Sequence, residues 1–127
     1  KRLIIKNTAE KCFDFIFTHG ANGEYGHPRH SGVHQAVKQL VSQKKLRGKW
    51  IFYFDYAKKD RKKFSPPIAK QNSEFTFFLS AKELAEKKKI MTKIYGFDPK
   101  GIDANYCTNP EAFKIIQTTG KQTNRRT

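Results

Sequence analysis

Three short runs of aromatic and β-branched residues, separated by segments of a different periodicity, constrain the fold of this chain more than any other feature of its sequence. The runs cover residues 13–18, 50–56 and 74–79, and each has the composition of a buried strand. In segment 30–43 the apolar residues instead recur at i, i+3, i+4, i+7 and i+8, the pattern of an amphipathic helix. Strands that alternate with helices predict an α/β domain built on a layered sheet. We expect the phenylalanines of the runs to form its core.

Local signals place the remaining elements. Ser-Ala-Lys-Glu at residues 80–83 has the pattern of a capping box that begins a second helix, and Gly96 is the expected end of that helix. Residues 112–116 are expected to form a last strand and residues 57–72 a basic loop, whereas residues 3–5 fit a strand or the end of a helix equally well. The domain is thus predicted to cover residues 1–117, followed by a disordered basic tail at residues 118–127.

The balance of charges limits the classes of partner. The chain has 26 Lys and Arg against 11 Asp and Glu, a net charge of +15. Such a charge favours anionic partners such as nucleic acid or a membrane surface, but a solvated, lysine-rich surface has the same composition and is the interpretation we prefer. The two cysteines are too few and too far apart for a disulfide framework or a CxxC metal site, so a reduced, cytoplasmic location is expected. No apolar run approaches the ~20 residues of a membrane-spanning helix.

The histidines are clustered. All four, His19, His27, His30 and His34, fall within residues 19–34. At 100° per residue, His30 lies in the first turn of the predicted helix on its apolar side, and His34 lies one turn further along. A helix N-terminus disfavours imidazolium and so keeps a ring neutral and able to bind a metal. On spacing alone, ordinary histidines at the edge of the core, satisfied by hydrogen bonds, are the preferred interpretation, because such pairs are common on helices.

The residues around the histidines are more specific. The stretch Gly-Glu-Tyr-Gly-His-Pro-Arg-His at residues 23–30, preceded by Thr-His at residues 18–19, resembles the second signature of the LmbE/PIG-L-like metal-dependent N-deacetylases. The resemblance is specific between residues 18 and 37 and weaker elsewhere. It implies a Rossmann-like layered sheet that holds one divalent metal, usually zinc, and an N-acetylglucosaminyl-type sugar conjugate as the substrate.

The resemblance also implies roles for particular residues. His30 would be a metal ligand. His27 would lie beside the reacting carbonyl and stabilise the developing oxyanion, and Tyr25 would contact the same group. These roles are chemically consistent, because amide hydrolysis needs a polarised carbonyl and a nucleophilic hydroxide, both of which a metal supplies.

Two features differ from the family pattern. Arg29 stands where the signature usually has Asp, and the family's HPDDE-type motif, which supplies two further metal ligands and the catalytic base, is absent from this sequence. We therefore expect the C-terminal part of such an enzyme, inactive by itself, whose strands expose apolar residues that an absent N-terminal half would cover. The alternative hypothesis is a basic α/β module that binds nucleic acid or another anionic surface. Such a module has no need of Tyr25, His27 and His30 on one loop.

Overall fold

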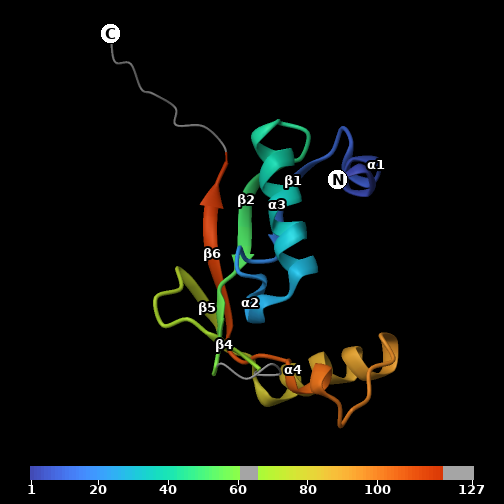
Figure 1. Cartoon of the computed structure of the whole chain (residues 1–127), viewed down its shortest axis with the longest axis vertical. Helices are drawn as coiled ribbons and strands as arrows, with labels where there is room; N and C mark the ends of the chain where they lie inside the picture. The colour runs from blue at the N-terminus through green and yellow to red at the C-terminus, as the bar shows by residue number, and fades with distance from the viewer. Residues whose placement is uncertain (61–65, 119–127) are drawn as a thin grey trace.

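The computed structural model describes residues 1–60 and 66–118 and contains a four-stranded sheet (Figure 1). The strands, in spatial order, are β1 (Cys12–Thr18), β2 (Arg47–Phe54), β6 (Glu111–Gln117) and β5 (Phe75–Phe77). β1 and β2 are parallel, whereas β6 is antiparallel to both of its neighbours. The predicted α/β class is confirmed, and the sheet is mixed. The predicted strands are all present, with boundaries that differ from the expected ones by at most three residues.

Helix α3 (Pro28–Ser42) supplies the long connection that a parallel strand pair requires, here between β1 and β2. It runs along one face of the sheet (Figure 1), as the apolar periodicity predicts. Val37, Leu40 and Leu46 form one buried cluster of the core, with Ile16 of β1 packed against it. Val33, expected on the apolar side of the helix, is exposed to solvent.

Helix α4 (Ala81–Lys89) begins at the predicted capping box. The Ser80 hydroxyl accepts a hydrogen bond from the Glu83 N–H at 3.3 Å, and the Glu83 carboxylate accepts one from the Ser80 N–H at 2.8 Å. The helix continues as a π-helical turn, η1 (Ile90–Ile94), and ends before Gly96, whose φ of +73° favours glycine. Both segments lie beyond the end of the sheet at which β2 finishes (Figure 1).

The structure decides several segments on which the sequence pattern was ambiguous or wrong. Residues 3–5 belong to a helix, α1 (Arg2–Thr8). Residues 57–72 are not simply a loop, because β3 (Tyr56–Lys58) and β4 (Pro67–Ala69) pair as an antiparallel two-stranded sheet. The short helices α2 (Gly23–Gly26) and α5 (Ile102–Asn105) complete the architecture. The predicted basic tail, residues 118–127, lies outside the described residues except for Thr118. Within the described ranges, no helix has the length and apolar character needed to cross a membrane.

The sheet face opposite α3 is aromatic and largely open. Because side chains alternate along a strand and Ile16 faces α3, Phe15 and Phe17 point to the other face, where they are 57% and 60% exposed. The Phe52 ring lies between them and the next strands, with its centroid 4.8 Å from that of Phe17 and 6.2 Å from that of Phe75. The expectation that the strands expose apolar residues is confirmed, but the assignment of Phe15, Phe17, Phe75, Phe77 and Phe78 to the core is wrong.

Candidate functional site

The loop between β1 and α3 is held against the end of β2. A side chain at Gly20 would overlap the carbonyl oxygen of Phe54, so this close approach of two backbones requires glycine. Gly26, with a φ of +89°, then reverses the chain into α3. Since β1 and β2 are parallel, the loop lies at their carboxyl ends, where ligand sites of open α/β sheets usually occur.

Glu24 has an unusual backbone conformation within this loop. Its φ of +61° lies in the left-handed region, which non-glycine residues rarely adopt, and the residue is only 6% exposed. The Glu24 N–H donates to the side-chain oxygen of Asn22 at 3.2 Å, and the Asn22 amide donates to the Tyr56 carbonyl oxygen at 2.7 Å. The loop is therefore tied to the start of β3, and the carboxylate of Glu24 is directed inward. Backbone strain of this kind often accompanies functional sites.

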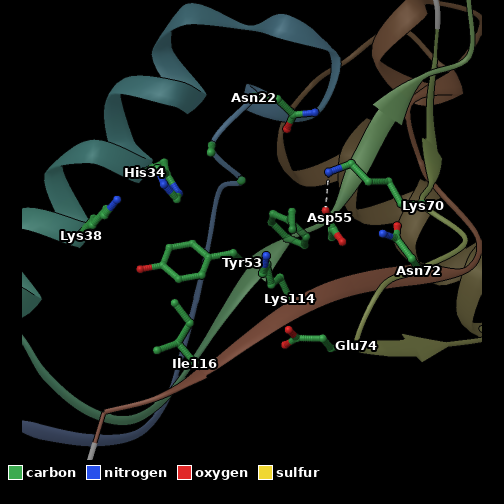
Figure 2. A pocket seen from close by; sticks show the side chains of 13 residues that line it. Asn22, His34, Lys38, Tyr53, Asp55, Lys70, Asn72, Glu74, Lys114 and Ile116 are labelled. Carbon is green, nitrogen blue, oxygen red and sulfur yellow. Dashed lines mark hydrogen bonds and ion pairs between the residues drawn. The ribbon is translucent and has the colours of Figure 1, made fainter.

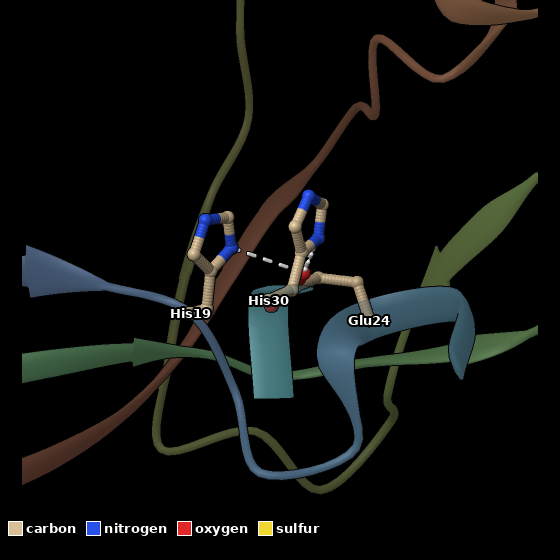
Figure 3. Close-up of side chains that lie close together, drawn as sticks. All are labelled: His19, Glu24 and His30. Carbon is tan, nitrogen blue, oxygen red and sulfur yellow. Dashed lines mark hydrogen bonds and ion pairs between the residues drawn. The ribbon is translucent and has the colours of Figure 1, made fainter. Parts of the chain in front are cut away.

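The carboxylate of Glu24 joins two histidines (Figure 3). Its Oε2 atom lies 2.5 Å from His30 Nδ1 and 3.1 Å from His19 Nδ1, while its Oε1 atom accepts a hydrogen bond from the Gly20 N–H at 2.7 Å. Burial raises the pKa of the Glu24 carboxyl, but hydrogen bonds from His19 and Gly20 outweigh burial, so the pKa lies below its ordinary value. Glu24 is thus an ionised, buried carboxylate at neutral pH.

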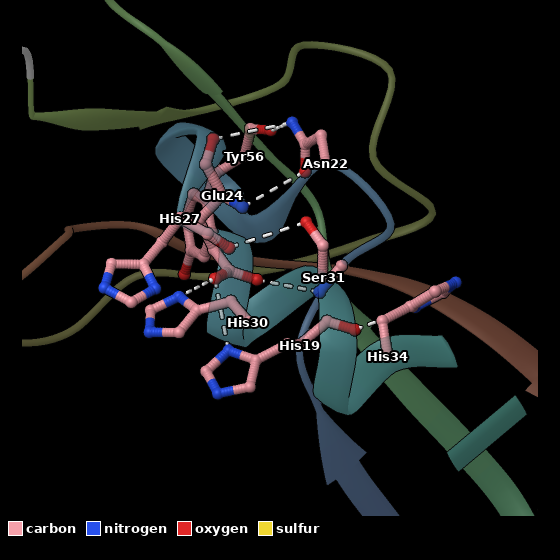
Figure 4. Close-up of polar contacts among 9 residues, drawn as sticks. His19, Asn22, Glu24, His27, His30, Ser31, His34 and Tyr56 are labelled. Atoms are coloured by element: carbon pink, nitrogen blue, oxygen red, sulfur yellow. Dashed lines mark hydrogen bonds and ion pairs between the residues drawn. The ribbon is translucent and has the colours of Figure 1, made fainter. Parts of the chain in front are cut away.

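Three imidazole rings form a row with His30 in the middle (Figure 4). The His30 ring centroid lies 3.9 Å from that of His19, with the planes 13° apart, and 4.4 Å from that of His27, with the planes 28° apart. Burial lowers the pKa of His30; Glu24 opposes this effect, and the nearby His19 and His27 add to it. His30 is therefore neutral near pH 7, as a metal ligand must be.

The residues that the signature predicts as a site do lie together. The Tyr25 ring stands edge-on to both His27 and His30, at centroid distances of 5.8 and 5.5 Å, and packs against Tyr106 at 4.6 Å. Burial raises the pKa of Tyr25, so its hydroxyl remains protonated. The Nδ1 atom of His27 is buried without a hydrogen-bond partner among the described residues. A buried polar atom in this condition is unusual in folded proteins.

His34 is separate from this group. It is buried on the inner side of α3, where its Nδ1 donates to the His19 carbonyl oxygen at 3.0 Å and its ring packs against Tyr53 at 4.8 Å. Because its Nδ1 atom is hydrogen-bonded to a backbone carbonyl and its ring packs against the core, His34 has a structural role. It anchors the end of β1 from which His19 projects.

A cavity of about 940 Å³ opens beside the three stacked histidines, large enough for a small organic ligand. Phe17, Phe54 and Phe113 form an apolar part of its lining. A polar group lies elsewhere in the lining, where the Tyr56 hydroxyl and the Lys87 ammonium both donate to the carboxylate of Glu111. The cavity thus combines an aromatic surface with two polar groups: the stacked histidines, and the cluster of Tyr56, Lys87 and Glu111.

A second cavity, of about 440 Å³, lies between α3 and the strands (Figure 2). Its lining includes three lysines, Lys38, Lys70 and Lys114, of which Lys70 is paired with Asp55 at 2.6 Å. His34 and Tyr53 complete one side of it. None of the predicted site residues borders this cavity.

One group of side chains beside the larger cavity could hold a metal ion. His19, Glu24 and His30 each offer one ligand atom, and these atoms all lie within 4.8 Å of one another. Imidazole nitrogens and carboxylate oxygens are ligands that zinc prefers. Of this set, only His30 was predicted as a ligand from the sequence. The signal for the other two was present, because His19 ends the first strand and Glu24 belongs to the signature stretch.

No protein-family model, no curated protein and no solved structure matches this chain.

Proposed function

We propose that this chain is the C-terminal part of a zinc-dependent N-deacetylase of the LmbE/PIG-L-like kind that acts on an N-acetylglucosaminyl-type sugar conjugate. In this proposal the sheet belongs to a larger Rossmann-like layered domain, and an HPDDE-type motif outside these 127 residues supplies the remaining ligands and the base. The observation that carries the proposal is the position of Tyr25, His27 and His30 on one wall of a cavity at the carboxyl ends of two parallel strands.

Each of these residues has a definite part in the proposed reaction. His30 would hold the zinc ion through a ring nitrogen. The ion, when bound, would polarise the carbonyl and supply a hydroxide nucleophile at neutral pH. His27 donates a hydrogen bond to the oxyanion that develops on the acetamide oxygen, a role worth about 10²–10³ in turnover for one donor. Tyr25, packed between the imidazole rings and Tyr106, closes one side of the cavity around the acetamide.

The lining of the cavity suits a sugar conjugate. Phe17, Phe54 and Phe113 present apolar area to the acetyl methyl group and the sugar ring, whereas Thr108, Glu111 and Lys87 are polar groups for hydroxyls. Binding sites of small ligands commonly pair an apolar lining with a few polar groups that set orientation.

The proposal is tested in a protein that joins this chain to an N-terminal half carrying a His-Pro-Asp-Asp-type motif. His30→Ala should lose zinc, because one of about three protein ligands is removed. His27→Ala should retain zinc and lose turnover on an N-acetylglucosaminyl substrate by roughly 10²–10³-fold. Equal loss of zinc in both variants, or full activity in either, contradicts these roles.

The basic surface supports a second candidate, a module that binds nucleic acid or another anionic partner. Its specific observation is the second cavity, which is lined by Lys38 and Lys114 as well as by the paired Lys70. This candidate predicts binding that weakens steeply with salt, needs no metal and is reduced by Lys38→Glu together with Lys114→Glu. A gel-shift or fluorescence titration of the chain with DNA at two salt concentrations distinguishes it from the enzyme.

A further inference from the structure

We infer that Glu24 is the positioning residue of the site: its carboxylate holds His19 and His30 in the Nδ1-protonated tautomer, so that the Nε2 lone pair of His30 faces the cavity for a divalent cation. The identity of the cation rests on the proposed function, whereas the role of Glu24 does not.

The hydrogen bonds determine the tautomers. An ionised carboxylate only accepts hydrogen bonds, so both ring atoms that face Oε2, at 2.5 and 3.1 Å, must carry protons. In a neutral imidazole the other nitrogen is then an unprotonated acceptor. Figure 3 shows that the second ring nitrogens of His19 and His30 both point away from Glu24. They lie on residues that line the 940 Å³ cavity.

Glu24 itself has little freedom to move. Its second oxygen, Oε1, is occupied by the Gly20 N–H at 2.7 Å, and its backbone N–H by Asn22 at 3.2 Å. The residue is buried and held at a positive φ. Because both carboxylate oxygens and the backbone are engaged, the carboxylate presents Oε2 to the two rings in one orientation (Figure 4).

His19 and His27 complete the positioning of His30. Their rings stack on its opposite sides at 3.9 and 4.4 Å, which restricts rotation of the His30 ring. In this inference His30 is the ligand, and His19 shares the Glu24 carboxylate with it. A histidine that binds a metal almost always donates its other ring N–H to a carboxylate, a carbonyl or water.

The chemistry of the presented atom selects the ligand class. A neutral imidazole nitrogen suits zinc, cobalt or nickel, whereas magnesium and calcium require oxygen ligands. The inference therefore predicts that Zn²⁺ or Co²⁺, and not Mg²⁺, perturbs the Nε2 atom of His30.

The test is long-range ¹H–¹⁵N NMR of the chain, labelled at its histidines, at neutral pH and without metal. His30 should show a protonated Nδ1 and an unprotonated Nε2, and His19 should show a protonated Nδ1. His34 is an internal reference, because its Nδ1 donates to a carbonyl and must carry a proton whatever happens at Glu24. Finding the Nε2-protonated form at His30 in the unmodified chain overturns the inference without any variant.

Two variants distinguish a role of Glu24 in positioning the histidine rings from a role in the stability of the fold alone. Glu24→Gln places an amide at the two rings and should switch at least one of them to the Nε2-protonated form, with His34 unchanged. Asp55→Asn is the matched control, because it alters a part-buried carboxylate that is hydrogen-bonded to Lys70 and Ser73 rather than to a histidine. Unchanged tautomers of both rings in Glu24→Gln, with His34 intact, refute the role of Glu24.

Metal titration distinguishes failure of this inference from failure of the proposed function. Where Zn²⁺ or Co²⁺ binds, Glu24→Gln should weaken binding by roughly 10–100-fold, the usual cost of losing such a partner, and Asp55→Asn should not. If His19 and His30 show the predicted tautomers but neither ion affects His30, the positioning role of Glu24 is supported and the metal role of His30 is contradicted. Equal affinities in Glu24→Gln and the unmodified chain contradict the positioning role.

Discussion

Removal of the Tyr56 hydroxyl tests the polar group that joins β3 to β6. The hydroxyl donates to the Glu111 carboxylate and accepts from the Ala112 N–H at 3.2 Å and from the Thr108 hydroxyl at 3.1 Å. Tyr56→Phe preserves the buried ring, deletes one hydrogen bond to a charged group and leaves the fully buried Ala112 N–H without a partner. A hydrogen bond to a charged group contributes about 1.5–3 kcal/mol, and an unsatisfied buried donor costs about 1–3 kcal/mol. Since these terms overlap, we expect the free energy of unfolding to fall by about 2–3 kcal/mol.

Urea denaturation followed by circular dichroism measures this loss as a decrease of roughly 1–2 M in the midpoint. Tyr53→Phe is the matched control, because Tyr53 is similarly buried but its hydroxyl has no hydrogen-bond partner among the described residues. The control should change stability by less than about 0.5 kcal/mol. If the two variants lose the same small amount, the Tyr56 network does not stabilise the fold and the reasoning is wrong.

The same hydroxyl predicts the alkaline limit of stability. Burial, and after it the hydrogen bond to Glu111, raises the pKa of Tyr56 well above its ordinary value. A group whose pKa is higher in the folded than in the unfolded state stabilises the folded protein. For tyrosine this contribution is complete below the unfolded pKa of about 10 and is lost as the pH rises above it. The unmodified chain should therefore lose stability above about pH 10 more steeply than Tyr56→Phe does, as urea midpoints at increasing pH would reveal. Parallel pH profiles would contradict the assignment.

Three further substitutions probe the fold. Leu40→Ala, at one of the most deeply buried side chains, should cost about 3 kcal/mol by urea denaturation, and a loss under about 1 kcal/mol would mean that the core under α3 is not packed. Ser80→Ala removes the cap of α4 and should cost about 1 kcal/mol, with Ser80→Asp as a capping control that retains most of the stability. Gly20→Ala should lower the thermal midpoint and disturb the His19 NMR signals, because the added methyl group would overlap the Phe54 carbonyl; a variant as stable as the unmodified chain would show that the loop does not need this approach.

Local signals in the sequence determined the helices and the composition of the site. The periodicity of residues 30–43 and the capping box at Ser80 depend only on near neighbours, so they predicted α3 and the start of α4 correctly. Tyr25, His27 and His30 belong to one short stretch, and a turn that enters a helix brings such residues together without help from distant segments. For the same reason, the sequence could identify them as a group before the sheet was known.

Only the tertiary structure decided the direction of β6, the exposure of the aromatic face and the role of Glu24. Alternating apolar residues show that a strand has an apolar face, but a second layer must be present to bury it, and Phe15 and Phe17 have none among the described residues. The carboxylate of Glu24 could as easily have faced water. It turns inward because Gly20 packs against the end of β2 and Asn22 bonds to Tyr56, contacts between residues more than 30 positions apart in the chain. Residue type could therefore single out the histidines, whereas the long-range packing of the loop determined which nitrogen of His19 and of His30 faces the Glu24 carboxylate.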